Sequence, residues 1–288
     1  MNSEMGVRRC AIVTGASAGI GRATALEFAR RGYGVVLAAR RAARLTALAD
    51  EIRGSGGDAL PVTADVTIPA DRERIVQAAL ERYGRIDVLV NNAGAGFTGT
   101  IEETPPEMMR ELVELNFMSA FGLTLLVLPV MRRQRSGHIV NVASVVGKMA
   151  FPLHGAYAAT KFAMVAMTEA LRGELAGSGV TTSVVLPAST RTEFFDVQRA
   201  RSPRHETVRA PMQSAEHVAR AIVTSVRRPR PEINPMPPLR LAYGLNAFFP
   251  ALRDIAGRLF YQRTLSRKPA RPSSSPPLQA EAASPAEE

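Results

Sequence analysis

Short apolar runs rich in Val, Ile and Leu alternate with longer segments whose apolar residues recur at helical spacing. This alternation is typical of β-α-β units, in which helices connect parallel strands. Most of the short runs are apolar on both faces, as strands covered by helices on each side should be. The pattern therefore predicts an α/β fold with a doubly wound parallel sheet. The candidate strands are residues 10–14, 33–39, 59–64, 86–91, 138–143 and 181–187.

A glycine-rich loop, "TGASAGIG", follows the first candidate strand and opens a helical segment. Glycines at this place let the backbone turn tightly and approach a pyrophosphate, whose charge then faces the helix N-terminus. The spacing is G-x-x-x-G-x-G rather than the common G-x-G-x-x-G. We interpret the loop as a dinucleotide site, with a tight turn that binds no ligand as the alternative. The residues assigned to it are Gly15, Ser17, Gly19, Ile20 and Gly21.

The second candidate strand ends in two arginines where an acidic residue would favour NAD. A cofactor with a free ribose 2′-hydroxyl normally meets a carboxylate near this point. The chain instead has Ala39, Arg40 and Arg41. The planar guanidinium of Arg40 can bind a 2′-phosphate through paired hydrogen bonds. The sequence therefore favours NADP(H) over NAD(H), unless the two arginines merely begin the next helix.

Tyr157 and Lys161 are four residues apart in the Ala-rich segment "GAYAATKFAM". Residues i and i+4 share a helix face, so the ammonium can lie beside the phenol. A neighbouring positive charge favours the phenolate and lowers the pKa of the tyrosine. Such a phenol could exchange protons with a substrate near neutral pH. The alternative is an ordinary tyrosine and lysine on a partly exposed helix.

Several motifs in the same order resemble those of the short-chain dehydrogenase/reductase family. They are "TGASAGIG", "ADVT" (64–67), "NNAG" (91–94), "ELNFMS" (114–119), "VNVASVVG" (140–147) and "YAATK" (157–161). The resemblance covers residues 8–192. It implies a Rossmann-type domain with about seven parallel strands and helices on both faces. It also implies an NAD(P)-dependent oxidoreductase that transfers hydride between NADPH and a carbonyl or secondary alcohol.

The resemblance assigns a role to each of four catalytic residues. Tyr157 would donate a proton to the carbonyl oxygen, and Lys161 would lower the pKa of Tyr157 and hold the nicotinamide ribose. Ser144 would hydrogen-bond the substrate oxygen and stabilise the charge that develops there. Asn116 would anchor a water that connects Lys161 to solvent. A cofactor-binding scaffold or sensor is the alternative, although loss of the tyrosine, lysine or serine would favour it and all three are present.

The remaining cofactor contacts are also implied by the resemblance. They are Asp65, Val66, Asn91, Ala93, Gly94, Pro187 and Thr192. The chain departs from the family after the sixth strand, where it reads "LPAST" and has Ala188 in place of a glycine. If this position requires a positive φ, alanine costs energy there; otherwise the change is harmless.

Substrate specificity in this family depends on two loops, which correspond to residues 145–155 and 192–202. Met149, Phe151 and Phe194 are assigned to the substrate site together with Ser144. These side chains predict an apolar ketone, aldehyde or secondary alcohol as substrate. The alternative is that they simply pack beneath their loops.

The net charge of +10 lies in the C-terminal third, since residues 199–268 contain 14 Lys or Arg and 4 Asp or Glu. Within this part, residues 239–263 carry apolar residues at helical spacing, and Pro250 is expected to begin a second helix or kink the first. The segment could pack in the core, close the active site, contact a neighbouring subunit or lie on a membrane surface. No nucleic-acid partner is predicted, because no binding motif accompanies the charge.

The domain organisation follows from these assignments. We predict a catalytic domain over residues 1–238, an amphipathic basic extension over 239–266 and a disordered Pro-, Ser- and Ala-rich tail over 267–288. The four histidines lack metal-ligand spacing, so no metal site is predicted.

The predicted location is cytoplasmic, with attachment to a membrane surface as the alternative. The start of the chain lacks a long apolar segment, and the apolar run 123–131 is too short to span a bilayer. The resemblance also implies a homodimer or homotetramer that assembles through helices near 105–134 and 155–176.

Overall fold

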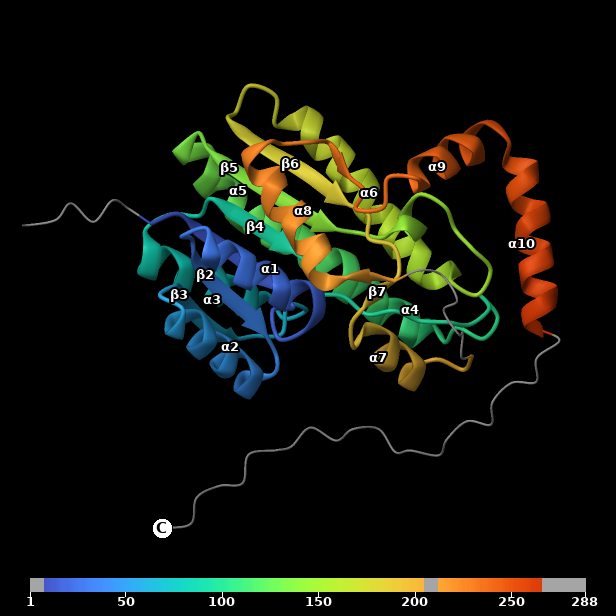
Figure 1. Cartoon of the computed structure of the whole chain (residues 1–288), viewed down its shortest axis with the longest axis horizontal. Coiled ribbons are helices and arrows are strands. Elements are labelled where there is room, and N and C mark those ends of the chain that lie inside the picture. Colours follow the sequence, from blue (N-terminus) through green and yellow to red (C-terminus); the bar gives the residue numbers. More distant parts are fainter. Residues whose placement is uncertain (1–7, 205–211, 266–288) are drawn as a thin grey trace, which may run out of the picture.

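Seven parallel strands form the central sheet of the computed structural model, which describes residues 8–204 and 212–265 (Figure 1). Their order across the sheet is β3-β2-β1-β4-β5-β6-β9, so the direction of winding reverses between β1 and β4. This order is that of a Rossmann-like fold, and the predicted doubly wound parallel sheet is confirmed. The strands are β1 (Cys10–Thr14), β2 (Gly34–Ala39), β3 (Asp58–Thr63), β4 (Val88–Asn91), β5 (Gly137–Val142), β6 (Val180–Val185) and β9 (Glu232–Ile233).

Helices cover both faces of the sheet. One face packs against α1 (Gly19–Arg30), α2 (Ala42–Gly54) and α8 (Ala215–Arg227). The other packs against α3 (Pro69–Tyr83), α5 (Ser119–Gln134) and α6 (Gly155–Glu174). Alternate residues of a strand point to opposite faces, so Val13 joins the first layer and Ile12 the second. This two-sided burial is the reason that the strands are apolar throughout.

The predicted strand boundaries agree with the structure to within two residues at each end. β1 begins and ends as predicted, whereas the strand predicted at 86–91 begins at Val88. The last strand of the sheet, β9, pairs through only two residues with the end of β6. A strand of that length has no recognisable period, so no sequence pattern identified it. A separate pair of short strands, β7 (Thr190–Arg191) and β8 (Gln213–Ser214), lies beyond the end of β6.

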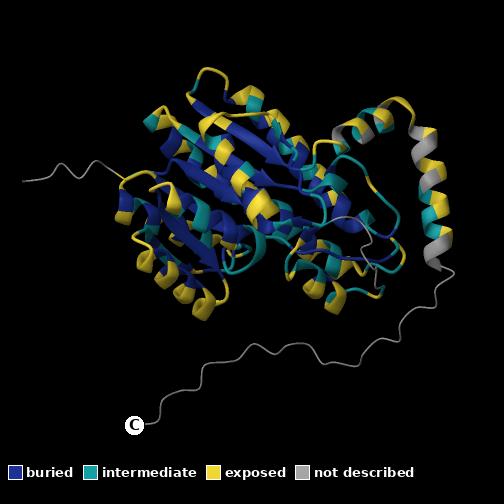
Figure 2. Ribbon diagram, viewed as in Figure 1, coloured by how far each residue is buried: buried dark blue, intermediate teal, exposed yellow. Residues whose placement is uncertain are grey.

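Two further helices form the C-terminal extension, α9 (Leu239–Phe248) and α10 (Pro250–Leu265). Pro250 begins the second of them, which confirms the first of the two expectations for this residue. Tyr243 of α9 packs against a core cluster under α6 and accepts a hydrogen bond from Asn234 Nδ2 at 3.5 Å. The extension projects from the body, and exposed residues follow much of its length (Figure 2). The predicted tail, 267–288, lies outside the described residues, and the three-part division of the chain stays a prediction.

A long helical stretch runs over residues 106–134 through α4 (Pro106–Val113), the π-helical turn η1 (Glu114–Met118) and α5. In the described part of the chain, this stretch alone is long and apolar enough to cross a membrane by length and composition. The apolar run 123–131, which by itself is too short to span a bilayer, is therefore part of the longer helical stretch 106–134. Leu123, Val127 and Met131 are buried against the sheet, which makes α5 a core helix of this domain.

Candidate active site

The glycine loop forms a tight cradle at the start of α1. Gly15 and Gly19 have φ of 64° and 54°, in the left-handed region that glycine adopts without strain. A β-carbon on Gly21 would lie 2.6 Å from Asn92 Nδ2 and closer still to the carbonyl oxygen of Gly15. Ala18 precedes the helix and provides no side-chain cap, so the first amides remain available to an anion. The loop therefore fits the pyrophosphate of a dinucleotide.

The ends of β1 and β4 are joined by hydrogen bonds that hold this cradle in place. Thr14 Oγ1 accepts from the main-chain nitrogens of Asn92 and Ala93, at 2.9 and 3.0 Å. Asn92 Nδ2 donates to the carbonyl oxygen of Thr14 at 2.8 Å. Ala93 is thereby fixed beside Gly15, at the point where the strand order reverses. Sequence reasoning missed Asn92, although the second asparagine of "NNAG" was a visible signal.

Two of the predicted cofactor residues turn their side chains into the fold. Asn91 Nδ2 donates to Asn141 Oδ1 at 2.8 Å, and Asn91 is buried between β4 and β5. The Ile20 side chain packs towards α8, against Ala215 and Ala219. The part of these two residues in lining a cofactor path stays a prediction.

Asn116, Gly94 and Lys161 meet at the carboxyl edge of the sheet. Asn116 is buried in the π-helical turn η1, a kind of turn that is frequent at functional sites. Its Oδ1 accepts from the main-chain nitrogen of Ala95 at 2.8 Å. A β-carbon on Gly94 would lie 2.9 Å from Asn116 Oδ1, so any other residue would crowd this oxygen, and it would be in ordinary contact with Lys161 Nζ at 3.5 Å. Lys161 Nζ donates to the carbonyl oxygen of Val142 at 3.0 Å.

Tyr157 lies on α6, on the same helix face as Lys161, and Ser144 follows β5 beside it. Burial raises the pKa of Tyr157 above its ordinary value, and a side-chain hydrogen bond with Ser144 acts in the opposite direction. Lys161 is not among the causes of this shift. The expected lowering of the Tyr157 pKa by Lys161 is therefore wrong for this structure. The physical reason is that the buried phenol loses its surrounding water, which disfavours the charged phenolate more than the Ser144 hydrogen bond favours it.

Burial acts on Lys161 as well and lowers its pKa to about 8. A buried ammonium loses its hydration, so it gives up its proton to form the neutral amine more easily than in water. At pH 7 the group is still mainly protonated, because the pH lies below this pKa. Lys161 can therefore donate hydrogen bonds to a bound ribose at neutral pH, although its pKa lies only slightly above that pH.

The predicted substrate residues lie in two separate segments, and the one expected as a loop at 192–202 is largely a helix. Phe194 begins α7 (Phe194–Arg201), and its ring centre lies 5.8 Å from that of Tyr157. Met149 and Phe151 lie half-buried in the loop that follows the short 3₁₀ turn η2 (Val145–Gly147). Phe194 thus places an apolar surface beside the ring of Tyr157, whereas contact of Met149 and Phe151 with substrate stays a prediction.

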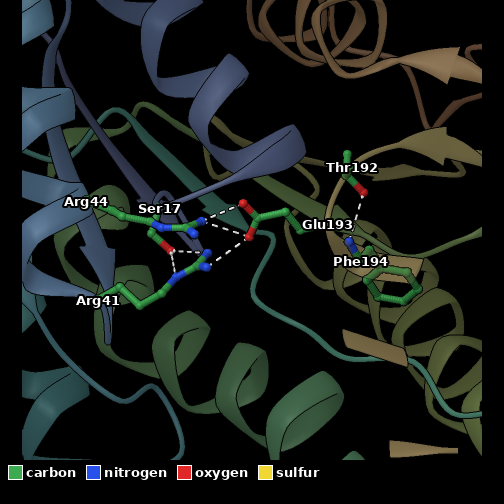
Figure 3. A network of polar contacts seen from close by, with 6 residues as sticks. All are labelled: Ser17, Arg41, Arg44, Thr192, Glu193 and Phe194. Carbon is green, nitrogen blue, oxygen red and sulfur yellow. Dashed lines mark hydrogen bonds and ion pairs between the residues drawn. The ribbon is translucent and has the colours of Figure 1, made fainter. Parts of the chain in front are cut away.

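The adenosine end of the site contains a cluster of charged residues (Figure 3). Arg41 donates to Ser17 Oγ from Nε and Nη2, at 3.1 and 3.0 Å. Glu193 accepts from Arg41 Nη1 at 2.9 Å and from Arg44 Nη1 at 2.6 and 2.8 Å. The two guanidiniums lower the pKa of the Glu193 carboxyl. Arg40, the arginine chosen from the sequence, has a side chain that is 75% exposed. Its Nη1 lies 3.8 Å from Asp65 Oδ2.

Sequence reasoning missed Arg41 as the partner of Ser17, and it missed Arg44 and Glu193 entirely. A second arginine directly after Arg40 was a signal for Arg41, and Arg44 follows on the first turn of α2. Glu193 had no local signal, because it approaches from a loop about 150 residues away in the chain.

The remaining predicted cofactor residues are found at the ends of β3 and β6. Asp65 Oδ1 accepts from the nitrogen and hydroxyl of Thr67, at 3.0 and 2.7 Å, and Val66 is buried beside it. Pro187 accepts from the nitrogen of Val145 at 3.1 Å. Ala188 does not adopt a positive φ, so its replacement of the family glycine causes no backbone strain.

Thr192 lies against the glycine loop. A β-carbon on Gly19 would be 3.0 Å from its Cγ2, so the end of β7 and the start of α1 are in close contact. The roles of these residues toward a cofactor remain predictions, but the structure brings them to one edge of the sheet.

A pyrophosphate cradle at the reversal of the strand order, with a buried tyrosine and lysine beside it, defines a nucleotide-dependent oxidoreductase. Residues 9–203 match the family model described as short chain dehydrogenase. The chain belongs to the short-chain dehydrogenase/reductase family, and it is an NAD(P)-dependent oxidoreductase.

Similar proteins include examples with either nucleotide. The 3-oxoacyl-[acyl-carrier-protein] reductase of Synechocystis sp. is 37% identical over 187 residues, which are 65% of this chain and 76% of that protein. A family member from Burkholderia phymatum, solved with NAD, has a TM-score of 0.78 and 29% identity and covers 93% of this chain and 98% of its own. One from Sphingobium yanoikuyae, solved with NADPH, has a TM-score of 0.74 and 32% identity and covers 86% and 95%.

Proposed function

We propose that this protein is an NADP(H)-dependent enzyme that interconverts a carbonyl group and a secondary alcohol in an apolar substrate. The observation that carries the proposal is the convergence of Tyr157, Ser144 and Lys161 at one edge of the sheet. Similarity to a 3-oxoacyl reductase supports a carbonyl substrate. The ring of Phe194 beside Tyr157 supports an apolar one.

The bound nicotinamide supplies or accepts the hydride. Because burial raises its pKa, Tyr157 is protonated at neutral pH and can donate its proton to a carbonyl oxygen during reduction. Ser144 can donate a second hydrogen bond to the same oxygen and stabilise its charge. Lys161 is held by the Val142 carbonyl and can position a ribose through its remaining donors.

The preference for NADP(H) rests on the basic residues at the end of β2. Ser17 and Arg41 are already hydrogen-bonded there, and Ala39 places no carboxylate against a 2′-phosphate. A planar guanidinium binds phosphate oxygens in pairs, and this arrangement is stronger than a neutral hydrogen bond. Arg41 is therefore the main candidate for the phosphate contact, with the exposed Arg40 as a second donor.

Titration of NADPH and NADH into the protein, followed by fluorescence, tests the cofactor preference. Wild type is expected to bind NADPH more tightly. Loss of a charged hydrogen-bond donor in Arg41→Ala is expected to weaken NADPH binding about 10- to 100-fold. NADH binding should change little, because its free 2′-hydroxyl needs no cation. Equal affinities for the two nucleotides in wild type would refute the preference.

We also propose that the protein forms a homo-oligomer through two helices of the domain that expose apolar side chains. Phe121 and Leu125 of α5 and Phe162 of α6 are 39%, 55% and 42% exposed. These residues lie on the two helices through which we expect a homodimer or homotetramer to form. Packing against a second copy would remove this apolar surface from water.

A second candidate adds membrane attachment to the same enzyme, which we propose to be cytoplasmic. Leu241 and Phe248 of α9 are 71% and 82% exposed, in a part of the chain with a strong positive charge. Apolar and basic residues on one helix suit the interface of an anionic membrane. Gly257 of α10 lies against Pro152, in the predicted substrate loop, with 3.6 Å from a β-carbon at Gly257 to the proline ring. Attachment there would bring lipid-like substrates to the site.

Sedimentation with phosphatidylserine-containing vesicles tests this attachment. The full chain is expected to pellet at low salt, and Phe248→Glu should reduce the bound fraction several-fold because a charge replaces an apolar contact. Ile68→Glu makes the same change at an exposed position outside the extension and should bind as wild type does. Failure of the wild-type protein to pellet would leave the extension with a role in closing the site or contacting a subunit.

A further inference from the structure

Glu193 occupies the centre of the cluster at the adenosine end of the site. Its carboxylate lies between the guanidiniums of Arg41 and Arg44, and Ser17 lies on the other side of Arg41 (Figure 3). Ser17 belongs to the glycine loop, and both arginines follow β2. Glu193 alone comes from a distant part of the chain, 152 residues from Arg41 and directly before α7.

The groups around this carboxylate are those that a phosphate monoester would use. Two guanidiniums supply several N–H donors, and the Ser17 hydroxyl supplies a further polar group. A dianionic phosphate makes stronger charge-assisted hydrogen bonds with such donors than a carboxylate does. The side chains of Arg41, Arg44 and Glu193 are all about half exposed, and exposed ion pairs contribute little to stability. The carboxylate can therefore be replaced at small cost.

We propose that Glu193 is a built-in counter-ion that competes with the 2′-phosphate of NADP(H) for Arg41 and Arg44 and thereby sets the selectivity between NADP(H) and NAD(H). This inference rests on the proposed NADP(H) preference. Two negative groups cannot share the guanidiniums without mutual repulsion, so the phosphate must displace the carboxylate. NAD(H) carries no group at this position and leaves the ion pairs intact.

Displacement of the Glu193 carboxylate by a phosphate also affects the part of the site around Tyr157. The residue after Glu193 is Phe194, whose nitrogen donates to Thr192 Oγ1 at 3.3 Å and whose ring packs beside Tyr157. Displacing Glu193 removes the ion pairs that hold the start of α7 across the nucleotide site. The same carboxylate therefore links the type of nucleotide bound to the start of α7, whose Phe194 packs beside Tyr157.

Glu193→Gln tests the competition, because it keeps the size of the side chain and removes its charge. We expect the dissociation constant for NADPH to fall about three- to tenfold, since the competing charge is gone. The constant for NADH should stay within about twofold of wild type. Asp196→Asn is the matched control: it removes a carboxylate three residues further along the chain, in the first turn of α7, which pairs with Arg199 instead. It should leave both constants unchanged.

Two outcomes would overturn the inference. Weaker binding of both nucleotides by Glu193→Gln would show that Glu193 closes over the dinucleotide as a clasp. Unchanged NADPH binding would show that the carboxylate and the phosphate do not compete.

Titration of 2′,5′-ADP and 5′-ADP separates this inference from the proposed function. If wild type binds 2′,5′-ADP more tightly and Glu193→Gln does not strengthen it, the phosphate site stands and only the role of Glu193 is wrong. If wild type shows no preference for the 2′-phosphate, the proposed cofactor preference fails, and the competition fails with it.

Discussion

Replacing Tyr157 by phenylalanine is expected to lower kcat by about 10²- to 10⁴-fold, the range for loss of a general acid. The substitution removes one oxygen and keeps the ring, so the packing against Phe194 should persist. Water cannot easily supply the proton instead, because Tyr157 is buried. The rate is measured with NADPH and a panel of apolar ketones and aldehydes, and nucleotide binding is measured separately by fluorescence.

Tyr33→Phe is the matched control for this experiment. It removes the same atom from another buried tyrosine, which packs against Phe28 and Arg9 away from the site. Its kcat should equal that of wild type. If Tyr157→Phe retains more than about a tenth of the wild-type rate, the proton comes from another group and the proposed role of Tyr157 fails. Lost nucleotide binding in this variant would instead indicate a disturbed site.

Gly21→Ala is expected to weaken the binding of both NADPH and NADH by at least about 100-fold, the lower bound for losing two charged hydrogen bonds. The added β-carbon would overlap the carbonyl oxygen of Gly15 and lie 2.6 Å from Asn92 Nδ2. Backbone cannot move aside as a flexible side chain can, so the loop must open. The amides at the start of α1 would then no longer point at the pyrophosphate. Fluorescence titration measures the affinity, and thermal unfolding measures the loss of stability.

Gly173→Ala provides the comparison, because nothing lies within 4 Å of the position of its β-carbon. Gly173 is in α6, and alanine there should raise the free energy of unfolding by about 0.5–1 kcal/mol without changing nucleotide affinity. If Gly21→Ala binds nucleotide as wild type does, the glycine loop is a structural turn and the cofactor must bind elsewhere.

Local sequence patterns were sufficient for the fold class and for the edge of the sheet at which the site lies. β1 could be placed to the residue, because a run apolar on both faces ends at a glycine loop. Gly15, Ser144, Tyr157 and Lys161 were also placed correctly relative to the strands and helices, since each motif follows a strand or begins a helix. Parallel strands with right-handed crossovers bring such strand ends together, so order along the chain was enough to predict proximity.

Burial and long-range contact were decided only by the tertiary structure. The sequence predicted a lowered pKa for Tyr157 from its distance to Lys161, but the pKa is raised, because the phenol is enclosed by groups from several elements. In the same way, Asn91 turns into the fold because Asn141 of β5 offers a partner there.

The adenosine end of the site shows the same division. Two consecutive arginines were visible in the sequence, and nothing local distinguished Arg40 from Arg41. The structure pairs Arg41 with Ser17 and Glu193, which are 24 and 152 residues away. A motif is determined by neighbours along the chain, whereas the partner and the electrostatic state of a side chain depend on the surfaces that folding brings against it.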